Sequence, residues 1–136
     1  TFFDILSTKA KQFGFCMEYA EGKKLTCCGD EPYNECEQKY AKNSTWLLHE
    51  AFCLFSQADK FKPYEKHHST VKDACELAQK LEAEQKVLKK LEAENLILYH
   101  TEDKNISRRK ELYTEEGRQY YKGNLWIPDD LETYKL

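Results

Sequence analysis

The residues best suited to chemistry in this 136-residue chain are six cysteines and four histidines. All the cysteines lie in the first 75 positions, at Cys16, Cys27, Cys28, Cys36, Cys53 and Cys75. An even number of cysteines in one part of a short chain is typical of a disulfide framework in an oxidising compartment. We therefore predict three disulfides. Their pairing stays open, apart from a bond between the adjacent Cys27 and Cys28, which ring strain excludes.

Other kinds of chemistry find less support in the sequence. No Cys-x-x-Cys pair is present, and the histidines are scattered at His49, His67, His68 and His100, so we predict no zinc site. No nucleophile with a base and no glycine-rich phosphate loop is found. His49 is interpreted as a structural residue beside the core, and His67 and His68 as exposed loop residues. The sequence thus predicts no enzyme, no metal and no cofactor.

Composition narrows the classes of partner. The formal net charge is −3, and 33% of the residues are charged, with both signs mixed along the chain, which argues against nucleic acid as a partner. No apolar run approaches the roughly 18 residues of a membrane span, so no membrane insertion is expected. Two sequons, at Asn43 and Asn105, are compatible with N-glycosylation. Together with the cysteines, they predict a secreted, extracellular glycoprotein.

Apolar spacing predicts an all-α fold, a disulfide-stapled bundle of about five helices in a single domain over residues 1–136. The first helix covers residues 2–20, because Phe2, Leu6, Phe13 and Met17 fit one helical face. Shorter helices are expected over 32–40 and 44–55, followed by a surface loop over 60–68. A long central helix over about 70–99 and a C-terminal helix over 107–122 precede an irregular aromatic tail. The disulfide-rich part is 1–75, and the C-terminal helix and tail occupy 107–136.

The long helix raises the question of what covers it. Read at alternating spacings of four and three, it carries a leucine seam from Leu77 to Leu98. One interpretation is antiparallel packing within the chain. The alternative is a homodimer through the Leu77–Leu98 seam, which would make the protein self-associating.

Aromatic residues are distributed unevenly. All seven Phe lie between Phe2 and Phe61, whereas the last 38 residues hold only Tyr and Trp among the aromatic types. Tyr and Trp combine apolar rings with hydrogen-bonding tips and are enriched at interfaces, although they also pack helix edges in monomers. With a neighbouring basic patch, they form a candidate partner-binding set of Tyr99, Arg108, Arg109, Tyr113, Tyr120, Tyr121, Trp126 and Tyr134.

In size, cysteine content, expected helical content and Tyr-rich C-terminal part, the chain resembles the small disulfide-bonded salivary proteins of blood-feeding mosquitoes, in particular the anopheline inhibitors of the alternative complement pathway. The resemblance implies immune evasion by a secreted inhibitor in saliva. It would bind a host plasma protein complex stoichiometrically, namely the C3 convertase formed by C3b with factor B. The alternative is a helical carrier of small apolar or amine ligands, similar to the odorant-binding and D7 families. That alternative is motivated by the cluster Phe13, Trp46, Phe52 and Phe55.

Overall fold

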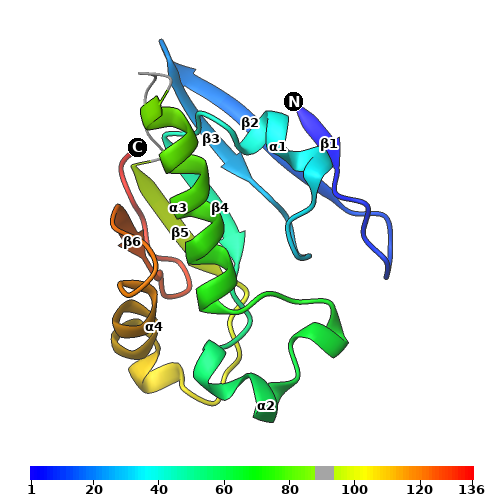
Figure 1. Ribbon diagram of the computed structural model, residues 1–136, viewed down its shortest axis with the longest axis vertical. Coiled ribbons are helices and arrows are strands. Elements are labelled where there is room, and N and C mark those ends of the chain that lie inside the picture. Colours follow the sequence, from blue (N-terminus) through cyan, green and yellow to red (C-terminus); the bar gives the residue numbers. More distant parts are fainter. Residues whose placement is uncertain (88–93) are drawn as a thin grey trace.

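The computed structural model describes residues 1–87 and 94–136, and its centre is a six-stranded mixed sheet (Figure 1). The strands follow chain order across the sheet: β1 (Phe2–Asp4), β2 (Phe13–Ala20), β3 (Lys23–Cys27), β4 (Trp46–Glu50), β5 (Asn95–Tyr99) and β6 (Asn124–Trp126). β1, β2 and β3 pair antiparallel, whereas β3, β4, β5 and β6 run parallel. The helices of the described part are α1 (Gln38–Ala41), α2 (Ala58–Phe61), α3 (Val71–Val87) and α4 (Arg109–Gly117).

The predicted all-α bundle is therefore wrong, and the fold is α/β. The expected helix over 2–20 is the β1–β2 hairpin. Its apolar residues satisfy a helical spacing, but Phe13, Phe15, Met17 and Tyr19 also alternate with a period of two, which is the pattern of a strand with one apolar face.

The expected helices over 44–55 and 70–99 are also corrected. Residues 46–50 form β4, which lies between two parallel neighbours and is buried on both faces, so its apolar run carries no alternation. The long segment contains α3 followed by β5. Leu77 and Leu81 belong to α3, Leu98 belongs to β5, and Leu88 and Leu91 lie outside the described residues. The single helical face that defined the leucine seam does not form.

Two of the predicted helices are confirmed in position. The segment 32–40 holds a 3-10 turn over Glu35–Glu37 that leads into α1, and Asn34 caps this turn with its side chain. The segment 107–122 holds α4, which begins after a 3-10 turn over Ile106–Arg108. Within residues 1–87 and 94–136, no helix has the length and apolar content needed to cross a membrane.

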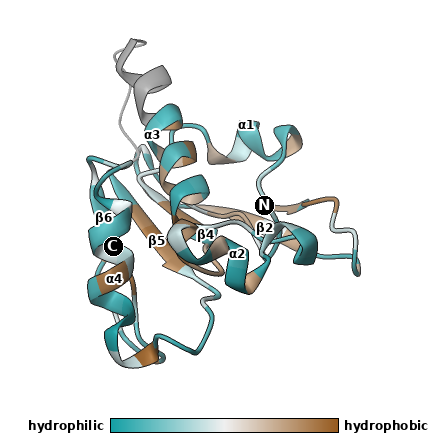
Figure 2. Ribbon diagram, turned by 60° about the horizontal axis from the view of Figure 1, so that its bottom comes forward, coloured by the Kyte–Doolittle hydropathy of each residue, from teal (hydrophilic) through white to brown (hydrophobic). Residues whose placement is uncertain are grey.

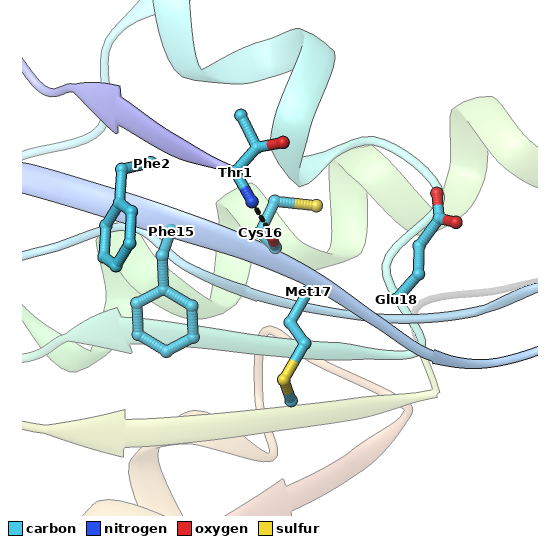
Figure 3. A pocket seen from close by; sticks show the side chains of 6 residues that line it. All are labelled: Thr1, Phe2, Phe15, Cys16, Met17 and Glu18. Atoms are coloured by element: carbon cyan, nitrogen blue, oxygen red, sulfur yellow. Dashed lines mark hydrogen bonds between the residues drawn. The ribbon is translucent and has the colours of Figure 1, made fainter.

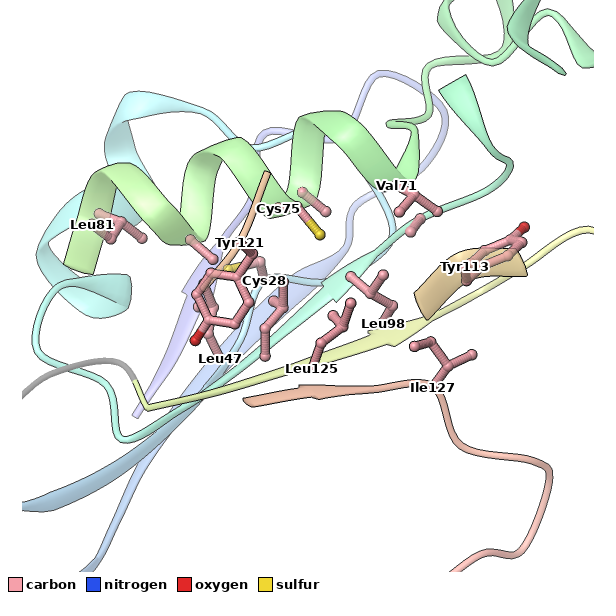
Figure 4. Close-up of a cluster of buried hydrophobic side chains, with 14 of the residues drawn as sticks. Cys28, Leu47, Val71, Cys75, Leu81, Leu98, Tyr113, Tyr121, Leu125 and Ile127 are labelled. Atoms are coloured by element: carbon pink, nitrogen blue, oxygen red, sulfur yellow. The ribbon is translucent and has the colours of Figure 1, made fainter. Parts of the chain in front are cut away.

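The main core lies between the sheet and the helices α3 and α4. Leu47, Leu96, Leu98 and Leu125 of the strands belong to this core, and Figure 4 shows Leu47, Leu98 and Leu125 beneath the side chains of α3. In Figure 2, β5 is strongly hydrophobic, whereas the helices carry mostly hydrophilic residues. Parallel strands require crossover connections. Here α3 lies in the connection from β4 to β5 and α4 in the connection from β5 to β6, and both pack their apolar side chains on the sheet.

The opposite face of the sheet carries a smaller cluster of Leu25, Trp46 and Ile97. Phe2, Phe13 and Met17 on the outer strands remain exposed. Figure 3 shows Phe2, Phe15 and Met17 on one side of β1 and β2, where they line an open depression of about 570 Å³.

The predicted disulfides are also wrong, because all six cysteines are free thiols. Cys28 and Cys75 belong to the main core, and Cys53 is fully buried beside it. Buried cysteine acts as a small apolar side chain, which explains these positions without any bond between them.

Six free thiols give a direct test of this correction. We expect protein purified without reductant and unfolded in guanidinium to react with about six equivalents of a thiol reagent, because no cysteine is bonded in the fold. Intact-mass measurement of the alkylated protein counts them. A protein that reacts only after reduction would contradict the structure.

Glu37 provides a second test, because its side chain is fully buried on the 3-10 turn. Burial raises the pKa of this carboxyl to about 7. In the unfolded chain the Glu pKa is about 4.3, so between this pH and 7 the folded protein keeps the proton and the unfolded chain has lost it. The free energy of unfolding therefore falls as pH rises from about 4.5 through 7.

We therefore expect Glu37→Gln to stabilise the protein at pH 8 and to have little effect at pH 4. The difference should be on the order of 1–3 kcal/mol, because Gln keeps an uncharged acceptor in the same place. Guanidinium unfolding at the two pH values measures it. Glu35→Gln, at an exposed position of the same turn, is the matched control and should show no such pH dependence.

Candidate functional site

Titratable residues gather at one edge of the sheet, where three parallel strands end. Asp30 follows β3, Glu50 is the last residue of β4, and His100 follows β5 directly. Because β3, β4 and β5 are neighbours and run in the same direction, their carboxyl ends meet at this edge. In open α/β sheets, ligands bind outside the carboxyl ends of the strands.

His68 reaches the same place from the segment that precedes α3. The Phe52 amide donates a hydrogen bond to the Ser69 carbonyl oxygen at 3.0 Å, and the His68 amide donates to the Pro63 carbonyl oxygen at 3.0 Å. The Ala51 amide in turn donates to the Tyr99 carbonyl oxygen at 2.9 Å. The segments that carry His68 and His100 are thus tied to the stretch after β4.

The three candidate ligands converge closely. The Asp30 Oδ1 atom lies 3.5 Å from His68 Nδ1 and 3.3 Å from His100 Nε2. One ligand atom from each residue falls within 4.8 Å of the other two. Glu50 Oε2 adds a second carboxylate at 3.5 Å from His68 Nδ1.

Burial makes this cluster unusual. Asp30 Oδ1, Glu50 Oε2 and His68 Nδ1 are all excluded from solvent, and none of them has a hydrogen-bond partner among the described residues. Burial raises the pKa of Glu50 to about 7 and lowers the pKa of His68. Unpartnered buried polar atoms are costly, and three of them facing one another are suited to bind a common cation.

Aromatic packing fixes the orientation of the imidazoles. The Phe52 ring stacks on His68, and His68 stacks on His100, with both pairs of ring centroids 5.0 Å apart. The Tyr99 hydroxyl donates to the Gly29 carbonyl oxygen and so holds the loop that carries Asp30. Gly29 has a φ of +80°, a conformation that glycine adopts without strain.

Two imidazoles and a carboxylate are a donor set that fits a divalent metal ion such as zinc. Catalytic zinc sites have three protein ligands and leave a further position open for water or substrate. The side chains of Asp30 and His100 are 35% and 42% exposed, so such a position is open to solvent. No zinc site was predicted from the sequence because the histidines are scattered there, whereas the structure brings His68 and His100 together with Asp30 in a cluster that resembles a metal site.

The sequence had pointed to other residues, and the structure does not bring these together. Tyr113 and Tyr121 are fully buried in the main core. The Arg109 guanidinium, also buried, donates to the Pro128 carbonyl oxygen and to Asp129. Among the rest, Tyr99 supports the Asp30 loop, Arg108 pairs with Glu111, Tyr120 lies under Lys72, and Trp126 contacts Tyr134.

The two sequon asparagines differ in their surroundings. Asn43 is exposed, with a φ of 62°. The Asn105 amide nitrogen instead donates hydrogen bonds to Gln57 and Glu102.

Asp30, Glu50 and His100 were missed because each stands alone in the sequence. The signal that would have found them is their place: each ends or follows a short apolar run, at Leu25–Cys28, Leu47–Leu48 and Leu96–Tyr99. Once those runs are interpreted as parallel strands, the three residues fall at one edge.

Comparisons with known proteins agree with this fold. No family model matches the chain, and no curated protein matches it. Among solved structures, the metallo-β-lactamase fold protein YhfI from Bacillus subtilis superposes with a TM-score of 0.69 at 14% identity, covering 95% of this chain and 46% of that one. The short form of human tRNase Z gives a TM-score of 0.53 at 21% identity, covering 91% of this chain and 38% of that one.

The chain therefore has a metallo-β-lactamase-like fold and spans less than half the length of the two structures. This finding overturns the resemblance to mosquito salivary proteins, which required an all-helical, disulfide-bonded chain. The complement-inhibitor function and its small-ligand-carrier alternative both depended on that helical fold and are corrected with it. The expectation of a protein without enzymatic activity is contradicted by this similarity and by the histidine–aspartate cluster.

The protonation of His68 tests the site geometry in metal-free protein. Burial and the neighbouring Lys9 ammonium both lower the pKa of His68. We expect its imidazole signals to titrate below pH 6.5 in NMR spectra and the midpoint to rise in Lys9→Met, because a nearby positive charge is removed. Lys11→Met, which removes a charge from the same loop, should leave the midpoint unchanged.

Proposed function

We propose that Asp30, His68 and His100 hold a divalent metal ion and that the protein is a metal-dependent hydrolase. The observation that carries the proposal is the convergence of the buried, unpartnered Asp30 Oδ1 and His68 Nδ1 atoms with His100 Nε2. The similarity to metallo-β-lactamase-fold structures also supports the proposal. A further support is that the titratable groups gather at the carboxyl ends of the parallel strands, where ligands bind in open α/β sheets. The chain spans less than half the length of each matched structure, so hydrolase activity of the whole protein is also part of what we propose.

A metal ion held by Asp30, His68 and His100 would supply Lewis acidity and would lower the pKa of a water molecule beside it. Asp30 and His100 are exposed enough to leave room for a substrate beside them. Glu50 lies behind His68, with one carboxylate oxygen bound by the Ser69 amide and the other facing the imidazole. This second Glu50 oxygen lies 3.5 Å from His68 Nδ1, the nitrogen that also faces Asp30, so Glu50 adds a second carboxylate on the same side of the imidazole.

Metal binding is the direct test. We expect the protein to take up zinc in calorimetric titration and to retain it through dialysis, as measured by elemental analysis. Asp30→Asn and His100→Asn should each weaken zinc binding by at least about tenfold, because a ligand is lost or neutralised. Asn is chosen at position 100 because it tolerates the left-handed conformation of that residue, whose φ is 53°.

The matched control is His67→Asn, which replaces the neighbouring exposed histidine at a φ of 56° and should bind zinc like the wild type. Hydrolysis is assayed with p-nitrophenyl acetate and bis(p-nitrophenyl) phosphate. Activity that is lost with a chelator and restored by zinc would support the proposal. A wild-type protein that binds no divalent metal would overturn it.

A further inference from the structure

We propose that Lys9 is the anion-binding residue of this site, and that its ammonium group and the Nε2 hydrogen of His68 together bind a phosphate or carboxylate group of the substrate. Lys9 lies in the loop between β1 and β2, whereas His68 lies more than fifty residues later, in the segment before α3. The Lys9 Nζ atom nevertheless lies 3.1 Å from His68 Nε2. The inference rests on the proposed metal site.

The loop is built to hold Lys9 at this position. Its first residue after β1, Ile5, is 1% exposed, and the Asn34 side-chain amide donates a hydrogen bond to the Ile5 carbonyl oxygen at 2.8 Å. Ser7 donates from its hydroxyl to Glu31 at 2.6 Å, beside Asp30. Ile5 also packs against Gly29, where a Cβ atom would come within 2.6 Å of its side chain. Lys9 is therefore anchored against the same loop that carries Asp30.

The ammonium group of Lys9 has donors to spare. It carries three N–H donors, and among the described residues its one hydrogen-bonding contact is with His68 Nε2. The residue itself is exposed, so the remaining donors face solvent at the mouth of the site. A partner with several acceptor oxygens and negative charge satisfies such a group best.

The hydrogen positions on His68 explain why an anion belongs between the two groups. Without a metal, His68 Nδ1 faces the carboxylates of Asp30 and Glu50 and carries the ring hydrogen, so Nε2 is free to accept from Lys9. When Nδ1 binds a metal through its lone pair, the ring hydrogen must lie on Nε2. Nε2–H and the Lys9 ammonium are then two donors side by side. The exposed Lys9 side chain can move outward, and an anionic oxygen accepts from both.

The surrounding charges restrict this role to Lys9. The carboxylates of Asp30, Glu31 and Glu50 face the cluster and would repel an anion by themselves. Lys66, the lysine nearest in sequence to His68, lies over the Phe52 ring with its Nζ atom 5.1 Å from the ring centroid. Lys9 is thus the cation in contact with the candidate ligands.

Binding of two matched probes tests the proposal. Phenylphosphonate and benzoate carry the same ring with a phosphonate or a carboxylate, and neither has a bond to hydrolyse. We measure their affinities for the zinc-loaded full-length protein by calorimetry. Lys9→Met should weaken binding of at least one probe by about tenfold or more, whereas Lys9→Arg should stay within about threefold of wild type, because it keeps a charged donor.

Lys11→Met is the control, since Lys11 lies in the same loop but faces Asp4 and the Phe13 ring. Its affinities should equal those of wild type. Loss confined to phenylphosphonate assigns a phosphate group to the substrate, and loss confined to benzoate assigns a carboxylate. Equal probe affinities in wild type and Lys9→Met, with zinc bound in both, would overturn this inference while the metal site stands. Absence of zinc in the wild type would instead overturn the proposed function itself.

Discussion

The parallel alignment of β3, β4 and β5 is the constraint on which the rest of this structure depends. It brings the ends of three strands, separated by some seventy residues of chain, to one edge of the sheet, and so places Asp30 beside Glu50 and His100. Hydrogen bonding continues past the strand ends, because the Cys28 amide donates to the Leu48 carbonyl oxygen at 2.9 Å. This hydrogen bond ties the start of the Asp30 loop to β4. Helices on one face follow from the crossovers that parallel strands require.

The site and the core place opposite demands on stability. In the core, apolar side chains of α3 and β4 bury their surface against one another. At the strand ends, buried atoms of Asp30, Glu50 and His68 lack hydrogen-bond partners, and each such atom costs roughly 1–3 kcal/mol. A fold tolerates this cost where the groups serve binding or catalysis. The buried imidazole of His49 bonds the Glu50 carbonyl oxygen through Nδ1, and its Nε2 atom likewise has no hydrogen-bond partner among the described residues.

The loop between β1 and β2 packs against the loop that follows β3, beside the site. Ile5 and Ser7 attach it to the Asp30 loop, and Lys9 reaches His68. A loop within the segment that was predicted as a helix over residues 2–20 therefore takes part in the charge balance of the cluster. The same hairpin leaves Phe13 and Met17 exposed on the sheet face opposite α3.

The sequence alone determined the local features of this protein. It located the short helix after Pro32 and the helix around Tyr113, and it contains no long apolar run, since these features depend on neighbouring residues. It did not separate strand from helix at Leu47 or Leu96, because a strand buried on both faces carries no alternation. Nor did it determine the bonding of the cysteines. The tertiary structure alone decided the site, since Asp30, His68 and His100 have no common spacing. Asp30 and His100 meet because neighbouring parallel strands end at the same edge, and the segment before α3 brings His68 to them.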